Sequence, residues 1–434
     1  MKIITLRIKN FRGIQSLTID FHDRMNVFIG ENGSGKSAVL DLLAIMLSKF
    51  IGRLRSESGT GRFYSEWDIT NGENETNNEI EIALNGDRVA WRFTKARPGR
   101  KRTTQSDFNQ IRPLVRRFQD GFEIDDKQSL PVCVHYGVNR VVLDIPLRIR
   151  IKHTFDQLST YQESLTGGTS SFRRFFEWFR DRQEIANEAY RLSSTSVSNG
   201  GSSVHLPRHH LYDRELSELS AVRRAIANLL PGFSGLTVLR KPLRMIVSKD
   251  QEQLSLNQLS DGEKCTLALV GDLARRLAIA NPSLEDPLQG YGIVMIDEID
   301  LHLHPEWQRM IIPGLQRTFP NCQFILTTHS PQVLSHVRDV ESVFVLKREG
   351  MDTLVSHPAS IYGMDSNRIL EDSMNVPDRP LEIQRQMDEL FSAIDEGDLP
   401  LAQGLLEVLR ETIGSHPELT KAQVLIRRKE VLGR

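Results

Sequence analysis

Residues 30–37 read GENGSGKS and match the phosphate-binding pattern G-x-x-x-x-G-K-[ST]. The apolar run Asn26–Ile29 precedes this motif, and the helix-compatible stretch Ala38–Lys49 follows it. A strand, a glycine-rich loop and a helix in this order direct backbone N–H groups and the positive helix end at a bound phosphate. The sequence therefore predicts an ATP site, with the nucleotide bound by Gly30, Asn32, Gly33, Ser34, Gly35, Lys36 and Ser37.

Two acidic residues follow a second apolar run, Gly292–Ile296. A buried strand would carry Asp297 and Glu298 to its carboxyl end, where α/β sheets bind their ligands. We expect the Ser37 hydroxyl and the Asp297 carboxylate to hold Mg²⁺, and Glu298 to act as the general base that polarises the attacking water. Lys36 is expected to assist catalysis by placing positive charge on the β- and γ-phosphates.

A histidine follows a third predicted strand, Cys322–Thr328. From the end of that strand His329 can reach the γ-phosphate, so it is predicted to be catalytic. Glu298, His329 and Lys36 are thus the predicted catalytic residues, and Ser37 and Asp297 the predicted metal ligands.

Three further segments resemble motifs of the ABC-type ATPases that include the RecF and SMC heads. Residues 259–264 read LSDGEK and are similar to the ABC signature, residues 299–305 resemble the D-loop, and residues 8–13 resemble the start of RecF-like heads. The resemblance implies that Ser260 and Gly262 contact the γ-phosphate held by an opposite subunit, and that Arg12 lies near the nucleotide.

The resemblance implies an α/β fold, namely a P-loop ABC-type head with a mixed sheet flanked by helices. We expect the head to occupy residues 1–145 and 246–362, interrupted by a helical insertion at 146–245 with a Ser-, Gly- and Thr-rich linker at Ser193–Ser203. Residues 363–434 are expected to form a C-terminal helical hairpin, because their apolar residues have helical spacing on either side of Glu396–Asp398. In the family, a glutamine after a strand senses Mg²⁺ and the γ-phosphate. Gln105, Gln110 and Gln119 are candidates for this residue, although none has the expected context, and the tract 134–140 is an alternative neighbour of the site.

The same resemblance implies partners. Because the signature of one copy would contact the nucleotide bound at the P-loop of the other copy, a homodimer through ATP-bound heads is predicted. A higher oligomer is an alternative. The D-loop sequence, the tract 136–140 and residues 143–148 look like the ATPase of Septu-type antiphage systems. We therefore expect a separate nuclease subunit, of HNH type, whose activity the ATPase controls in antiphage defence. A RecF- or SMC-like DNA-binding ATPase in replication or repair is the alternative.

Two other ABC-type classes fit less well. Transporter ATPase subunits place the signature much nearer to the P-loop and have glycine at the position of Asp261. Nucleases of the overcoming-lysogenisation type carry a C-terminal nuclease domain, whereas the residues after His329 are mostly helical and contain no acidic strand-end cluster.

Composition agrees with a soluble globular protein: 39% of the residues are hydrophobic and 26% are charged. The net charge of −1 excludes a globally basic nucleic-acid binder, but the segment Arg88–Arg117 is strongly basic and is a candidate DNA contact. No membrane partner is expected, and the start of the chain lacks the apolar core of a signal peptide, which predicts a cytoplasmic location.

Overall fold

The computed structural model describes residues 1–125, 127–139, 155–167, 171–198, 209–350, 352–374 and 379–432. Contacts divide the chain into an N-terminal unit, Met1–Met364, and a C-terminal unit, Asp365–Arg434. The tract residues 140 and 143–148, and the predicted boundary at 145/146, lie outside the described residues. In the described part of the chain, no helix has both the length and the apolar character needed to cross a membrane.

A six-stranded mixed sheet organises the N-terminal unit, with strand order β13-β12-β3-β11-β10-β6. All neighbours are parallel except β13, which pairs antiparallel with β12 at one edge. The central strands are buried along their whole length, which explains why they appear in the sequence as continuous apolar runs. The strands are β3 (Met25–Gly30), β6 (Val132–Tyr136), β10 (Gly292–Ile296), β11 (Cys322–Thr327), β12 (Val343–Glu349) and β13 (Asp352–Ser356).

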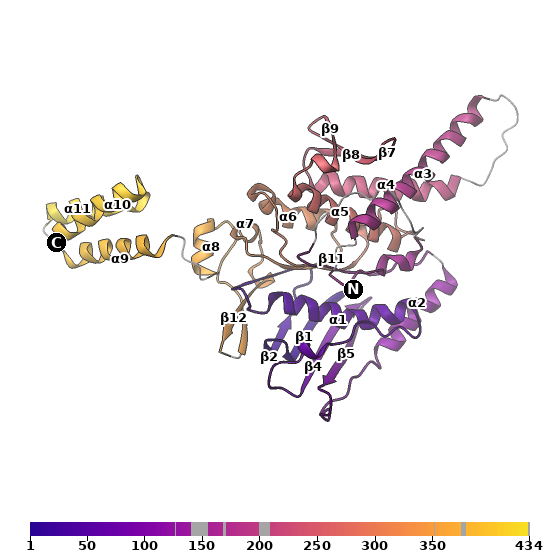
Figure 1. Ribbon diagram of the computed structural model, residues 1–434, viewed down its shortest axis with the longest axis horizontal. Coiled ribbons are helices and arrows are strands. Elements are labelled where there is room, and N and C mark those ends of the chain that lie inside the picture. The colour runs from indigo at the N-terminus through magenta and orange to yellow at the C-terminus, as the bar shows by residue number, and fades with distance from the viewer. Residues whose placement is uncertain are drawn as a thin grey trace. The chain divides into compact units, whose positions relative to one another are not determined.

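A second, antiparallel sheet has the order β2-β1-β4-β5. Helix α1, Lys36–Arg55, packs against both this sheet and the six-stranded sheet (Figure 1). The hairpin predicted to turn at Asn85-Gly86 is present, because β4 and β5 pair from Leu84↔Asp87 onward. The four strands are β1 (Lys2–Phe11), β2 (Ile14–Asp20), β4 (Glu75–Leu84) and β5 (Asp87–Ala96).

The region predicted as a helical insertion contains two long helices and also β structure. Helix α3 runs from Ser171 to Ser198, so the first residues of the predicted Ser193–Ser203 linker are helical. After α4, His209–Leu229, the chain forms a small antiparallel sheet. This sheet begins before residue 245, inside the range that was predicted to be helical. Its strands are β7 (Phe233–Arg240), β8 (Leu243–Lys249) and β9 (Glu252–Ser255). The remaining helices of this unit are α2 (Ile111–Ile124), α5 (Asp261–Ala280), α6 (Pro305–Thr318) and α7 (Pro331–Leu334).

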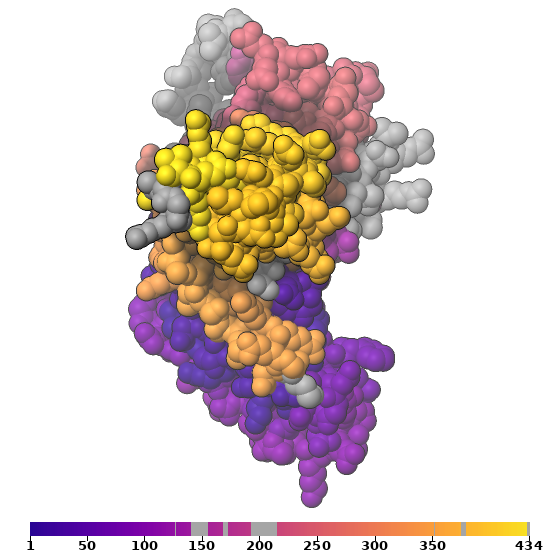
Figure 2. All heavy atoms as spheres, turned by 90° about the vertical axis from the view of Figure 1, so that its left-hand side faces the viewer, coloured from indigo at the N-terminus to yellow at the C-terminus, as the bar shows by residue number. Residues whose placement is uncertain are grey.

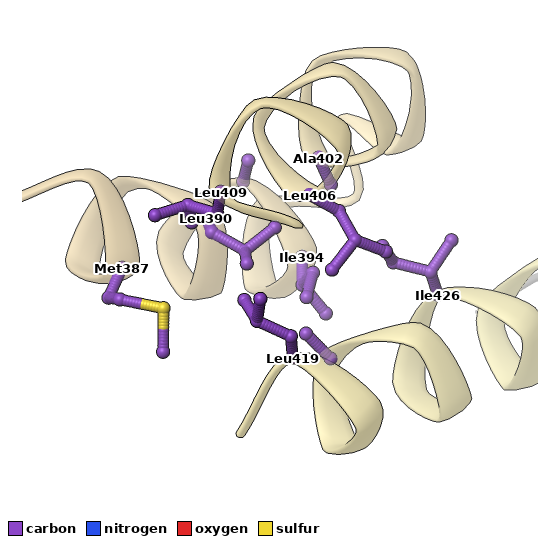
Figure 3. Packing of buried hydrophobic residues seen from close by; sticks show 10 residues of the cluster. Met387, Leu390, Ile394, Ala402, Leu406, Leu409, Leu419 and Ile426 are labelled. Carbon is purple, nitrogen blue, oxygen red and sulfur yellow. The ribbon is translucent and has the colours of Figure 1, made fainter. Parts of the chain in front are cut away.

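The C-terminal unit has its own hydrophobic core, formed by three helices rather than the predicted two. Leu390 of α9, Leu409 of α10 and Leu419 of α11 are among the buried side chains that meet there (Figure 3). In Figure 2 the atoms of these helices, coloured yellow, form one closely packed group. The helices are α8 (Ser366–Asp372), α9 (Leu381–Glu396), α10 (Leu399–Ile413) and α11 (Pro417–Leu432).

Candidate functional site

A pocket of about 380 Å³ lies where β3, β10 and β11 end. These strands are parallel neighbours, so the residues that follow them meet at the same edge of the sheet. The pocket is lined by Gly13, Ile14, Asn32, Gly33, Ser34, Gly35, Lys36, Ser37, Ala38, Asp297, Glu298, Thr327, His329, Arg348 and Thr353.

The phosphate-binding loop connects β3 to α1 in a conformation that requires glycine. Gly33 and Gly35 have φ values of 82° and 106°, in the left-handed region that side chains disfavour. The Lys36 ammonium group donates hydrogen bonds to the carbonyls of Gly30 (2.8 Å) and Glu31 (2.9 Å). Burial lowers the pKa of Lys36, and the nearby Asp297 and Glu298 oppose that shift. A cationic group is therefore held at the loop, close to two carboxylates.

Gly30 serves packing, and it is not among the described residues that line the pocket. A Cβ atom at this position would lie 2.2 Å from the Leu346 carbonyl oxygen of β12. The first glycine of the motif thus allows β12 to pair closely with β3.

Asp297 joins the loop to the neighbouring strands. Its Oδ1 atom accepts hydrogen bonds from the hydroxyls of Ser37 (3.1 Å) and Thr327 (2.6 Å). The side chain is buried, and its backbone N–H donates to the Tyr136 carbonyl at 2.9 Å. A carboxylate and a hydroxyl oxygen side by side are the hard oxygen ligands that suit Mg²⁺.

Glu298 has a constrained backbone. Its φ of 48° lies in the left-handed region, which is costly for a residue other than glycine. Its N–H donates to the Thr327 hydroxyl at 2.7 Å, and its carbonyl accepts from the Leu301 N–H at 3.0 Å. These bonds hold the turn in place, and the Glu298 side chain lines the pocket beside Asp297.

His329 also lines the pocket, two residues beyond the end of β11. Its backbone N–H donates to Asp300 Oδ1 at 3.3 Å, and the Thr328 hydroxyl donates to the same oxygen at 2.5 Å. Asp300 therefore fixes the turn that carries His329.

Arg12 lies beside the pocket and outside its lining. Its guanidinium group donates to Asp41 (2.7 Å) and Asp68 (3.0 Å). Burial alone would lower the pKa of Arg12, but the hydrogen bonds that Arg12 donates to Asp41 and Asp68 outweigh burial and raise this pKa. The adjoining residues Gly13 and Ile14 do line the pocket.

Ser260 and Gly262 also lie outside the described lining of this pocket. Ser260 caps helix α5, and its N–H and hydroxyl donate to Glu263 Oε2 at 2.8 and 2.9 Å. Lys249 donates to the other oxygen of Glu263 at 2.6 Å. A Cβ atom on Gly262 would lie 2.1 Å from the His302 carbonyl oxygen, so glycine lets the signature and D-loop segments touch.

The candidate glutamines Gln105, Gln110 and Gln119 do not line the described pocket. The side chain of Gln110 accepts a hydrogen bond from the Ala90 N–H at 2.7 Å, which gives it a structural role on β5. The alternative tract comes nearer, because β6 pairs with β10 and the Tyr136 carbonyl bonds to Asp297.

Thr327, Arg348 and Thr353 were not predicted to reach the site. Thr327 could have been found, because a hydroxyl at the end of a buried strand next to an acidic strand end can serve that carboxylate. Arg348 of β12 and Thr353 of β13 belong to no motif. They line the pocket because β12 pairs with β3 and β13 pairs with β12, with Arg348 opposite Thr353.

Comparisons with known proteins identify relatives over most of the chain. Residues 25–335 match the family model described as "AAA domain, putative AbiEii toxin, Type IV TA system". "Retron Ec83 probable ATPase" from Escherichia coli is 34% identical over 429 residues, covering 88% of this chain and 78% of the relative.

Two more distant relatives match nearly their whole length. "Septu protein PtuA" from Bacillus thuringiensis is 22% identical, covering 90% of this chain and 89% of the relative. "DNA replication and repair protein RecF" from Streptococcus agalactiae serotype V is 22% identical, covering 79% of this chain and 96% of the relative. These matches confirm the predicted similarity to RecF-like and Septu-type ATPases, whereas the similarity to a retron ATPase was not predicted.

Proposed function

Because this chain belongs to the family described as "AAA domain, putative AbiEii toxin, Type IV TA system", we propose that it binds ATP with Mg²⁺ and hydrolyses it between two paired copies. One observation carries the proposal: Asp297 Oδ1 accepts hydrogen bonds from Ser37 of the phosphate-binding loop and from Thr327 of β11. These two hydrogen bonds connect the loop, the end of β10 and the end of β11, which precedes His329, at one pocket.

The loop residues Asn32–Ser37 would bind the β- and γ-phosphates through backbone N–H groups, and Lys36 would add positive charge. The Ser37 hydroxyl and the Asp297 carboxylate fit Mg²⁺, because both present oxygen ligands and lie within hydrogen-bonding distance of each other. When bound, the ion would supply positive charge beside the phosphate oxygens.

Glu298 is the proposed general base. Its carboxylate would accept a proton from the attacking water, while the Thr327 hydroxyl and the fixed turn hold Glu298 in place. His329, on the next strand end, would donate a hydrogen bond to the γ-phosphate and stabilise the charge that develops there.

The proposed pairing of heads rests on Ser260 and Gly262. In the described chain they lie outside the lining of the phosphate pocket, so a second copy would have to bring its Ser260 to the γ-phosphate. Charge-assisted hydrogen bonds from both copies to one triphosphate would then hold the dimer until hydrolysis removes the γ-phosphate.

We further propose that the paired heads control a separate nuclease, of HNH type, in antiphage defence. The relatives named as a retron ATPase and a Septu protein support this role. A DNA-binding role in replication or repair is the second candidate, supported by the RecF relative and by the exposed basic residues of the segment Arg88–Arg117.

The replacement Glu298→Gln tests the hydrolytic centre. The variant should bind ATP normally, release phosphate at least about a hundred-fold more slowly, and accumulate as an ATP-bound dimer in light scattering. The matched control is Glu306→Gln, on α6 outside the described pocket lining, which should hydrolyse ATP like the natural protein. Undiminished phosphate release by Glu298→Gln would remove Glu298 from the role of base.

A further inference from the structure

One large aromatic side chain is exposed on a segment that is hydrogen-bonded to Arg12, the residue before Gly13 and Ile14 of the pocket lining. Trp67 is 89% exposed, the highest value for a large hydrophobic residue in the described part of the chain. Trp91 and Trp178, by contrast, are fully buried. Tryptophan normally buries most of its ring, so a ring left in water calls for a ligand or a partner.

The backbone below this ring is firmly held. Trp67 is the middle residue of the short 3₁₀ helix η1, Glu66–Asp68. The Asp68 carboxylate accepts hydrogen bonds from the N–H and hydroxyl of Ser65 at 2.7 and 2.9 Å, and from the Arg12 guanidinium at 3.0 Å. The Arg12 N–H also donates to the Asp68 carbonyl at 2.9 Å. An exposed ring on a fixed backbone loses little conformational freedom when it binds a ligand.

These bonds also locate the ring relative to the pocket. Arg12 directly precedes Gly13 and Ile14, which line the pocket, and it forms an ion pair with Asp41 of α1 at 2.7 Å. Helix η1 therefore stands next to the turn between β1 and β2, on the side of the pocket where that turn lies.

The pocket itself has nothing suited to a nucleobase. Its described lining is glycine, small polar or charged, with Ile14 and Ala38 as the apolar members, and it contains no tryptophan, tyrosine or phenylalanine. With the phosphates bound at the loop as proposed, the base of the nucleotide would lie over a neighbouring surface. Stacking on an aromatic ring would bury both faces that otherwise stay in water.

We propose that Trp67 stacks on the purine base of the nucleotide whose phosphates occupy this pocket. This assignment rests on the proposed ATP binding and adds the subsite that holds the base. The ring would then contribute to the affinity for a nucleotide but not to the affinity for its phosphates alone.

The test compares a ligand that has a base with one that lacks it. ATP and inorganic tripolyphosphate are titrated into the full-length protein by calorimetry, at concentrations where light scattering detects no self-association. Trp67→Ala should weaken ATP binding about ten-fold and leave tripolyphosphate binding unchanged, whereas Trp67→Phe should keep most of the ATP affinity. Tyr190→Ala removes another exposed aromatic ring, on α3, and should change neither affinity.

Each contrary result has a clear meaning. Unchanged ATP affinity in Trp67→Ala, or an equal loss for both ligands, would overturn the stacking assignment. Unchanged ATP affinity, together with weaker self-association when light scattering is repeated at higher protein concentrations, would overturn it in favour of a protein interface. If the natural protein binds neither ligand, the proposed function itself fails, which is a different result from a failure of Trp67 alone.

Discussion

The hydroxyl group of Tyr136 donates a 2.9 Å hydrogen bond to the Asp272 carboxylate inside the N-terminal unit. Asp272 also accepts from Arg275 at 2.6 Å and from Arg276 at 2.7 Å, and all four side chains are buried. Burial alone would raise the pKa of Asp272, but the charges of Arg276 and Arg275 lower it. The Tyr136 carbonyl accepts from the Asp297 N–H, so this cluster links helix α5 to the strand end that carries Asp297.

The cluster makes a prediction about stability. Asp272→Ala would leave two buried guanidinium groups without their counter-charge and should lower the free energy of unfolding by about 3–5 kcal/mol. Tyr136→Phe removes one of several bonds to Asp272 and should lower it by only about 1 kcal/mol. Urea unfolding followed by circular dichroism measures both changes, and equal losses in the two variants would contradict this account.

Thr327 provides a prediction about catalysis. Its hydroxyl donates to Asp297 and accepts from the Glu298 N–H, so Thr327→Val keeps the shape of the side chain and removes both bonds. We expect kcat for ATP hydrolysis to fall about ten-fold or more, with ATP affinity changed much less. Thr327→Ser keeps the hydroxyl and should retain most of the activity. A Val variant as active as the Ser variant would show that the hydroxyl is dispensable.

The sequence predicted the centre of the site because its members belong to local motifs at strand ends. The loop Asn32–Ser37, Asp297, Glu298 and His329 all line one pocket. Arg348 and Thr353 could not be predicted, since they reach the pocket through strand order, and strand order depends on contacts between distant segments. The roles of individual site residues stay predictions.

Predictions for the helical regions were less complete. Leu419, Ala422 and Ile426 of α11 have helical spacing and are buried, so a signal for the third C-terminal helix existed but was not used. The small sheet β7–β9 is harder to predict, because its outer strands β7 and β9 are partly exposed and β9 has only four residues. The predicted division of the chain into domains stays a prediction beyond the observed boundary after Met364.

Complementation between inactive variants tests the pairing of heads. Lys36→Ala damages the phosphate-binding loop, and Ser260→Ala damages the signature, so each variant alone should have very low activity. In a mixed dimer, the Lys36→Ala copy would offer its intact Ser260 to the intact loop of the other copy, which restores one complete site. Phosphate release should therefore reappear when the two purified variants are mixed. Full activity of Ser260→Ala alone, or no recovery in the mixture, would argue against shared sites.

The basic segment Arg88–Arg117 separates into paired and unpaired cations. In the described structure Arg88 and Arg92 form ion pairs with Glu81 and Glu79, whereas no ion pair is found for Arg100, Lys101 or Arg102. Replacing these last three by Ala should weaken DNA binding. The salt dependence should also become shallower, with the magnitude of the slope of log affinity against log salt concentration reduced by about three. The double variant Arg88→Ala, Arg92→Ala is the control, and we expect it to have the smaller effect. Fluorescence anisotropy at several salt concentrations measures DNA binding by both variants. If the triple variant binds DNA with unchanged affinity, the loop is a solvated surface with no role in DNA binding.

The C-terminal unit offers an apolar surface that its own core does not use. Leu401 and Val408 lie seven residues apart on α10, which places them on the same face, and they are 52% and 50% exposed. We expect this face to dock a partner or a neighbouring copy, because the removal of exposed apolar side chains from water lowers the free energy. Leu401→Asp together with Val408→Asp should reduce the oligomer size measured by light scattering, or the recovery of the proposed nuclease subunit in a pull-down. ATP affinity should stay unchanged, because the phosphate pocket belongs to the N-terminal unit.

Gln403→Asp and Glu407→Asp together change two polar positions of the same helix and serve as the control. If the apolar pair can be charged without effect on either measurement, the face does not dock these partners.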